Sequence, residues 1–106
     1  MLAITNSDLF SGNLNFVFGL AQSPGRCAAI SLFRLRMGAD EQRFHRRAVK
    51  EAVHELGHTW GLSHCQNPQC VMHFSNSLAD TDRKETDWCD ICDTKLRKSL
   101  ALQSSP

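Results

Sequence analysis

The sequence has no tyrosine, only three prolines, and no apolar run near the roughly 20 residues that a membrane-spanning helix needs. Neither sign of charge dominates, because 12 lysines and arginines face 11 aspartates and glutamates. Composition therefore gives no reason to expect binding to nucleic acid or to an anionic membrane surface. Residues 1–6 also lack the basic and apolar regions of a signal peptide. We predict one small cytoplasmic domain without nucleic-acid or membrane partners.

Cysteine is more abundant, with five in 106 residues. In a chain without an export signal they are not expected to form a disulfide framework, because the cytosol keeps thiols reduced. Four fall into two close pairs of the metal-binding type, Cys65 with Cys70 and Cys89 with Cys92. We predict a closed, structural zinc site formed by these four thiolates, with a redox dithiol or buried free cysteines as alternatives. The fifth, Cys27, lies in an apolar stretch and is predicted to be a buried small hydrophobe.

The first third of the chain is predicted to form strands. Residues 2–5 are short and apolar, and apolar side chains recur at every second position of residues 14–20. A third run, residues 27–35, is apolar on both alternating faces until Arg34. This pattern favours a strand inside a sheet that is covered on both sides.

From Asp40 the apolar period changes to that of a helix of about five turns. The stripe consists of Phe44, Ala48, Val49, Ala52, Val53, Leu56 and Trp60. Asp40 can cap the start of this helix, and Gly61 can end it with a left-handed turn. A polar segment, residues 75–87, separates the cysteine pairs, and a terminal helix is expected around Leu96 and Leu100.

One eleven-residue segment reads His-Glu-Leu-Gly-His-Thr-Trp-Gly-Leu-Ser-His, the extended zinc-protease motif H-E-x-x-H-x-x-G-x-x-H. On a helix, His54 and His58 lie about 40° apart, so both imidazoles can reach one ion. Gly61 lets the chain turn back so that His64 supplies the third ligand. Three neutral imidazoles leave the fourth tetrahedral position to water, whose pKa zinc lowers towards about 7. Glu55 lies beside the ligands and can take a proton from that water.

Together these motifs resemble the metzincin clan and, within it, the archaemetzincins, whose hallmark is the extended zinc motif joined to a four-cysteine zinc site. The resemblance implies that Met72 is the Met-turn residue beneath the catalytic zinc, where packing chemistry alone indicates only a core methionine. It implies an α+β, zincin-like fold. Residues 1–63 would form a mixed β-sheet and the active-site helix, and residues 64–106 a small zinc-stabilised subdomain. Residues 14–20 would lie at the sheet edge along the cleft, where a substrate backbone can pair.

Metzincin catalytic domains usually carry further strands and a helix ahead of the strand that residues 2–5 represent. The chain is therefore expected to be the C-terminal part of a longer catalytic domain. Without the preceding elements, the sheet would expose an apolar edge and face.

The sequence thus predicts a zinc metallopeptidase that holds two zinc ions and acts on a peptide or protein. In this interpretation His54, His58 and His64 hold the catalytic zinc, and Glu55 activates its bound water. One alternative is a catalytically silent, zinc-stabilised module that binds peptides or proteins. Glu55 argues against it, because nothing structural requires a carboxylate beside the metal. A further alternative is a redox switch in which oxidation of the four cysteines releases zinc.

Overall fold

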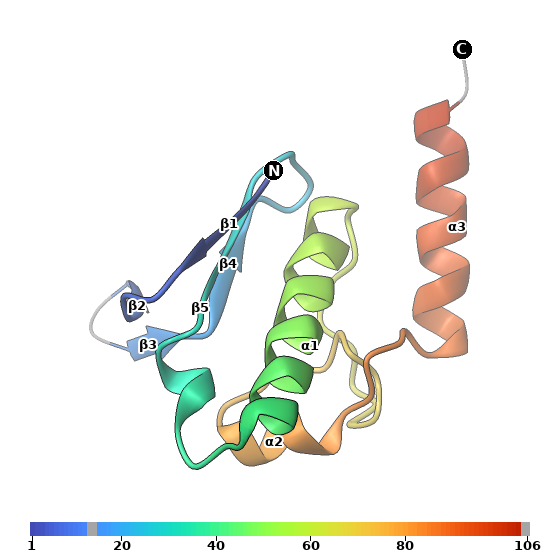
Figure 1. The fold of residues 1–106 in the computed structure, drawn as a ribbon. Coiled ribbons are helices and arrows are strands. Elements are labelled where there is room, and N and C mark those ends of the chain that lie inside the picture. Colours follow the sequence, from blue (N-terminus) through green and yellow to red (C-terminus); the bar gives the residue numbers. More distant parts are fainter. Residues whose placement is uncertain (13–14, 105–106) are drawn as a thin grey trace.

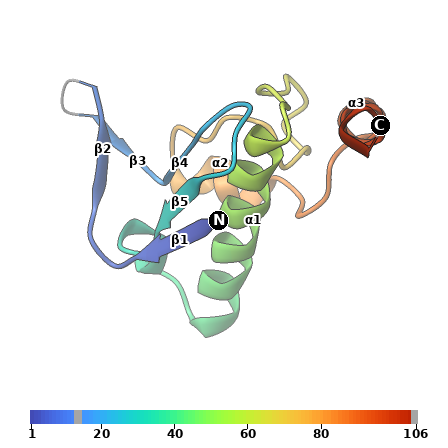
Figure 2. The same ribbon diagram turned by 90° about the horizontal axis from the view of Figure 1, so that it is seen from above.

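A computed structural model of the chain describes residues 1–12 and 15–104. A small β-sheet lies on one side of a long helix, α1 (Glu41–Thr59), and the terminal helix, α3 (Asp90–Ser104), stands on the other side (Figure 1). Figure 2 shows the same arrangement from above. The elements therefore form an α+β arrangement in which α1 is central.

The sheet has three strands in the order β1-β5-β4. These strands are β1 (Leu2–Thr5), β4 (Gly19–Ala21) and β5 (Ala28–Ser31). The middle strand, β5, pairs in parallel with β1 and antiparallel with β4. The predicted mixed sheet is thereby confirmed.

The strand predicted over residues 14–20 is divided at Phe18. The first part is β3 (Asn15–Val17), which forms a separate antiparallel hairpin with β2 (Leu9–Ser11). The second part is β4, which joins the main sheet. The division arises because the two parts pair with different partners, while Phe18 itself is buried and its carbonyl accepts a hydrogen bond from the Ser31 N–H. Leu14, which the prediction included, lies outside the described residues.

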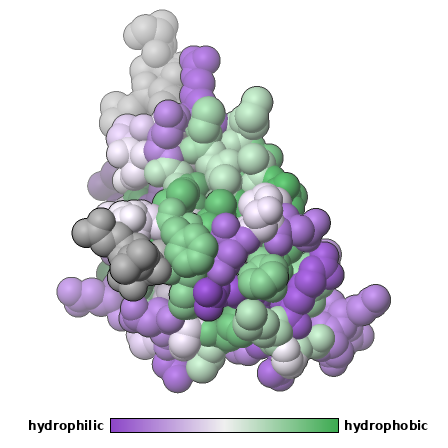
Figure 3. Space-filling model, turned by 90° about the vertical axis from the view of Figure 1, so that its left-hand side faces the viewer, coloured by the Kyte–Doolittle hydropathy of each residue, from purple (hydrophilic) through white to green (hydrophobic). Residues whose placement is uncertain are grey.

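Within residues 1–12 and 15–104, only one face of the sheet is covered by a helix. Ala28 and Ile30 of β5 are buried on the side of α1, while Ala29 shares the opposite face with its register partners Ala3 and Leu20. Leu20 is 41% exposed. The prediction that β5 is covered on both sides is therefore wrong, and the expected exposed apolar face is present. Figure 3, viewed from the side of the sheet, shows apolar side chains gathered there.

The predicted helix is confirmed as α1. Its start is capped by Asp40, whose carboxylate accepts a hydrogen bond of 2.8 Å from the Arg43 N–H. Gly61 follows the helix with a φ of 95°, the left-handed turn that glycine allows. The predicted apolar stripe is only partly buried, whereas the most buried positions of α1 are mainly polar. These positions are Arg47, Lys50, Glu51, His54, Glu55, Gly57 and Thr59.

Two helices lie in the C-terminal part. The predicted terminal helix is confirmed as α3, whereas α2 (Leu78–Arg83) lies inside the polar segment for which no helix was predicted. The Ser77 hydroxyl caps α2 by accepting a hydrogen bond from the Asp80 N–H. Among the described residues, no helix is long and apolar enough to cross a membrane.

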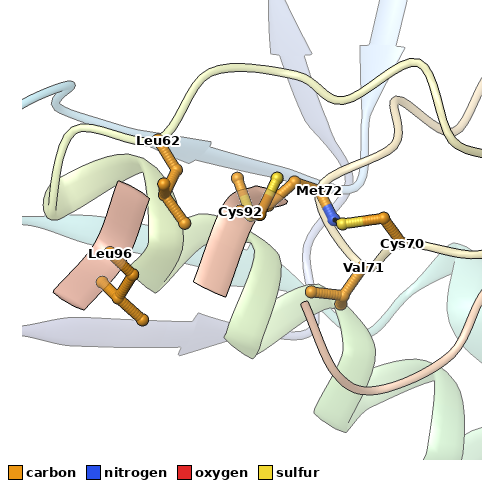
Figure 4. Close-up of a cluster of buried hydrophobic side chains, with 6 residues drawn as sticks. All are labelled: Leu62, Cys70, Val71, Met72, Cys92 and Leu96. Carbon is orange, nitrogen blue, oxygen red and sulfur yellow. Dashed lines mark hydrogen bonds between the residues drawn. The ribbon is translucent and has the colours of Figure 1, made fainter. Parts of the chain in front are cut away.

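A buried apolar cluster lies between the end of α1, the loop that follows it, and α3 (Figure 4). It consists of Leu62, Cys70, Val71, Met72, Cys92 and Leu96. Two of the six are cysteines of the predicted zinc site. The packing of this part is therefore linked directly to the thiol cluster, as expected where metal binding supplements a small core.

Candidate metal centres

Three imidazoles meet at the end of α1 and the turn after it. The ligand atoms of His54, His58 and His64 all lie within 4.8 Å of one another. The Nε2 atoms of His54 and His58 are 3.1 Å apart. Two nitrogens bound to one tetrahedral zinc at about 2.1 Å would be about 3.4 Å apart. The predicted ligand set is therefore assembled at a spacing that suits zinc.

Backbone carbonyls orient two of these rings. The Nδ1 atom of His54 lies 2.7 Å from the Val71 oxygen, and that of His58 lies 2.7 Å from the Leu62 oxygen. Since a carbonyl oxygen only accepts, each Nδ1 carries the proton and each Nε2 is left to bind a metal. Burial, followed by the charge of Lys84, lowers the pKa of His54 to about 3. The ring is therefore neutral, as metal ligation requires.

Glu55 is buried beside the imidazoles, at the wall of a cavity of 820 Å³. Its carboxyl group rests against β4, because a Cβ atom at Gly19 would lie only 2.6 Å from Glu55 Oε2. Burial, then a hydrogen bond with Glu51, raises the pKa of Glu55 to about 9. A divalent cation on the imidazoles would oppose this rise, because a nearby positive charge favours the carboxylate.

Sequence reasoning missed three residues of this site. Glu51 lies one turn before Glu55, and that spacing on one helix face could have revealed it. Lys84 follows α2 and is only 2% exposed, although a lysine in a polar segment is ordinarily expected in solvent. Gly19 gives no local signal either, because its role depends on a side chain from α1.

The four predicted cysteines also come together, with their sulfurs within 4.8 Å of one another. The sulfurs of Cys65 and Cys89 are 3.7 Å apart. That separation matches the roughly 3.8 Å between two sulfurs on one tetrahedral zinc and is far from a disulfide's length of about 2.05 Å. The Cys70 sulfur accepts hydrogen bonds from the N–H groups of Met72 and Cys89. The donor set therefore fits a closed zinc site.

The thiols differ in their readiness to ionise. A hydrogen bond from the Cys92 backbone N–H lowers the pKa of Cys89 to about 7. Burial raises the pKa of Cys70 and of Cys92. A bound cation is therefore needed for all four to be thiolates together.

Comparison with known proteins decides the family. The model of Peptidase family M54 matches residues 1–98. The chain belongs to peptidase family M54. An archaemetzincin of Pyrococcus abyssi is 50% identical to this M54 chain. The match covers 93% of this chain and 55% of the relative. The predicted resemblance to the archaemetzincins is thereby confirmed.

Solved structures agree with this assignment. The crystal structure of archaemetzincin from Methanopyrus kandleri is 47% identical, with a TM-score of 0.90, over 94% of this chain and 55% of that one. The archaemetzincin of Archaeoglobus fulgidus, complexed with malonate, is 49% identical, with a TM-score of 0.83. The match covers 89% of this chain and 58% of that one. The M54 chain described here thus spans about half the length of the relatives it matches.

Met72 of this M54 chain is fully buried directly against α1. A Cβ atom at Gly57 would lie 2.5 Å from the Met72 sulfur and 3.2 Å from Nε1 of Trp88. Trp88 in turn lies near Trp60, with 6.3 Å between ring centroids. The methionine therefore packs against the turn of α1 that lies between His54 and His58.

Two short connections link the two candidate metal centres of the M54 chain. His64 and Cys65 are adjacent in sequence, and the Cys65 N–H donates to the Met72 carbonyl over 3.0 Å. The Nδ1 atom of His73 lies 2.8 Å from the Cys65 carbonyl. Cys27 belongs to neither centre, and the prediction that it is buried is wrong, because it is exposed at the end of the loop before β5.

Proposed function

We propose that this chain carries the catalytic residues of a zinc metallopeptidase that hydrolyses peptide bonds. The observation that supports the proposal is the convergence of three imidazoles beside the buried carboxyl group of Glu55, on the wall of one cavity. His54, His58 and His64 would hold the catalytic zinc. Their three nitrogen donors leave a position for a reactant, as in catalytic zinc sites and unlike closed structural sites.

Zinc held by these imidazoles would polarise the substrate carbonyl and make a water molecule acidic enough to serve as the nucleophile at neutral pH. Glu55 takes the proton of the attacking water and delivers it to the leaving amine. Its place against Gly19 keeps the carboxyl group at the cavity wall, facing the reactants. The carbonyls of Val71 and Leu62 hold two imidazoles in the required tautomer throughout.

The substrate would bind along β4. This strand lies at an edge of the three-stranded sheet and lines the cavity, so an extended peptide can pair with its backbone. Phe16 and Phe74 line the same cavity, and Phe74 lies 5.0 Å from the ring of His64. Apolar side chains on either side of the scissile bond would contact these two rings.

A second zinc ion would be held by Cys65, Cys70, Cys89 and Cys92. Four thiolates close the coordination sphere, so this ion has a structural role. It would join the loop after α1 to the start of α3 and stabilise the apolar cluster there. Met72 would support the catalytic site from below as the Met-turn residue.

The first experiment is elemental mass spectrometry of the purified, reduced chain, followed by a peptide-library screen. We expect two zinc ions per chain and hydrolysis that falls about 100- to 10,000-fold in Glu55→Gln, without loss of zinc. Glu41→Gln, an exposed carboxylate at the start of the same helix, is the matched control and should retain full activity. Hydrolysis that persists in Glu55→Gln would refute the mechanism. Binding of library peptides without turnover would favour the silent binding module.

A further inference from the structure

Two buried titratable side chains, Glu51 and Lys84, lie behind Glu55, outside the metal ligands. Glu51 is 4% exposed, and Lys84 is 2% exposed. Glu51, Glu55 and Lys84 line the same cavity, and the charge of Lys84 acts on both carboxyl groups. Neither Glu51 nor Lys84 belongs to the two ligand clusters.

Lys84 connects the two elements on either side of the catalytic site. It directly follows α2, and its Nζ donates a hydrogen bond of 2.9 Å to the carbonyl of His73. His73 immediately follows Met72. The ammonium thereby joins the segment beneath the imidazoles to the carboxyl groups on α1.

The Glu55 carboxyl group is confined on two sides. The backbone of β4 at Gly19 limits it on one side, where no room exists even for a methyl group. Glu51 contacts it from the preceding turn of α1. Burial raises the pKa of Glu51, and the charge of Lys84 opposes this rise. The ammonium therefore favours the carboxylate form of Glu51 over the neutral acid.

We propose that Glu51 and Lys84 are positioning residues whose paired charges hold the Glu55 carboxyl group in its place beside the imidazoles. The inference rests on the proposed function, because positioning has a catalytic effect only if Glu55 acts on the attacking water. The pairing itself does not depend on that function.

A matched control is available in the same α1–α2 contact. Lys50 is also buried, and its Nζ donates to the carbonyls of Thr81 and Asp82 at 3.1 and 3.4 Å. The carboxyl groups that act on its charge are Asp82 and Glu85, not the pair on α1. Lys50→Met therefore removes a buried ammonium that is not paired with the carboxyl groups on α1. It also relieves the repulsion between Lys50 and Lys84, so it should not weaken the proposed arrangement.

The pairing is tested by urea unfolding of the zinc-loaded, 106-residue chain. Lys84→Met should raise the unfolding equilibrium constant by about 100-fold, because a buried charge loses its partner. Adding Glu51→Gln to Lys84→Met should lower the unfolding equilibrium constant again by at least about tenfold, because a neutral amide no longer needs a cation. Strictly additive effects in this cycle would overturn the pairing. A Lys84→Met/Glu55→Gln cycle without coupling would overturn the action of Lys84 on Glu55.

The positioning role is tested by kinetics on a peptide that the library screen identifies. Lys84→Met and Glu51→Gln should each lower kcat at least about tenfold, with KM and zinc content unchanged, because ground-state binding does not involve Glu55. Lys84→Arg should restore most of kcat, and Lys50→Met should leave it near wild type. Equal losses in Lys50→Met and Lys84→Met would overturn the positioning role and indicate a purely structural lysine.

The two proposals fail in different ways. If the wild-type chain hydrolyses no peptide, the proposed function fails, while the unfolding cycles still decide whether Lys84, Glu51 and Glu55 are coupled. If the wild type is active and Glu51→Gln retains full kcat, the positioning role fails and the peptidase function stands. Should Lys84→Met not fold, Glu51→Gln and Lys84→Arg carry the kinetic test.

Discussion

Gly57→Ala is a demanding test of the packing beneath the imidazoles. Alanine is the best helix former, so on helix propensity alone the substitution should stabilise α1 by about 1 kcal/mol. The structure predicts the opposite sign. The new Cβ atom would lie 2.5 Å from the Met72 sulfur, about 1.0–1.5 Å inside the usual contact distance of about 3.5–4.0 Å.

The magnitude follows from how little room Met72 has to move. Its side chain is fully buried, and Trp88 Nε1 lies 3.2 Å from the same Cβ position. Overpacking of a closed core costs about 1–3 kcal/mol. After subtraction of the propensity gain, we expect Gly57→Ala to be destabilised by up to about 2 kcal/mol. Met72→Val in the Gly57→Ala background should recover part of this loss by removing the overlapping sulfur.

The assay is urea unfolding of the zinc-loaded chain, followed by far-ultraviolet circular dichroism, with the two single variants and the double variant compared in one cycle. The packing described here would be supported if the double variant were less destabilised than the sum of the two single variants. If Gly57→Ala were more stable than wild type by the full propensity gain, Met72 could not lie under this turn, and the placement of the methionine would be refuted.

Two further predictions concern charge and metal. Arg47 binds both carboxylate oxygens of Asp82, at 2.7 and 2.8 Å, and this lowers the pKa of Asp82 below its ordinary value. The pair therefore stabilises the fold above about pH 4 and loses its effect as the pH falls through the lowered pKa. Asp82→Asn should cost about 2 kcal/mol at pH 7 and progressively less as the pH falls through the lowered pKa of Asp82, and a cost in urea unfolding that does not change with pH would contradict this. Chelation of zinc should destabilise the region around α3 earlier than it destabilises the sheet. Hydrogen exchange should then show early loss of protection at the amides of Cys92 and Leu96, and uniform loss along the chain would contradict a local role of the metal.

Features that depend on local spacing could be predicted from the sequence. The ends of α1 followed from Asp40 and Gly61, because a cap and a left-handed glycine act within one turn of the chain. The convergence of the three histidines could be expected from residue spacing, because they lie on one helix and its adjoining turn. The cysteine pairs come together only through the fold, yet each pair has a spacing typical of metal ligands.

Features that depend on which element covers which face could not be predicted. The apolar period of α1 predicts one buried stripe, but α1 lies between the sheet and α2, so its polar face is enclosed as well. Lys84 is buried because it follows α2, which packs against α1. No residue near Lys84 in the sequence indicates that it is buried. The division at Phe18 likewise depends on a second pairing partner, β2, whose three residues carry no strong alternation.

The position of Trp60 and Trp88 determines what intrinsic fluorescence can report. The chain has two tryptophans and no tyrosine. Both tryptophans pack against the cluster that contains Cys70 and Cys92. The emission of the protein therefore originates at one place, next to the thiol site, and should respond to metal loading there. The strands contribute almost nothing to this signal, so unfolding of the sheet alone would go unseen by fluorescence.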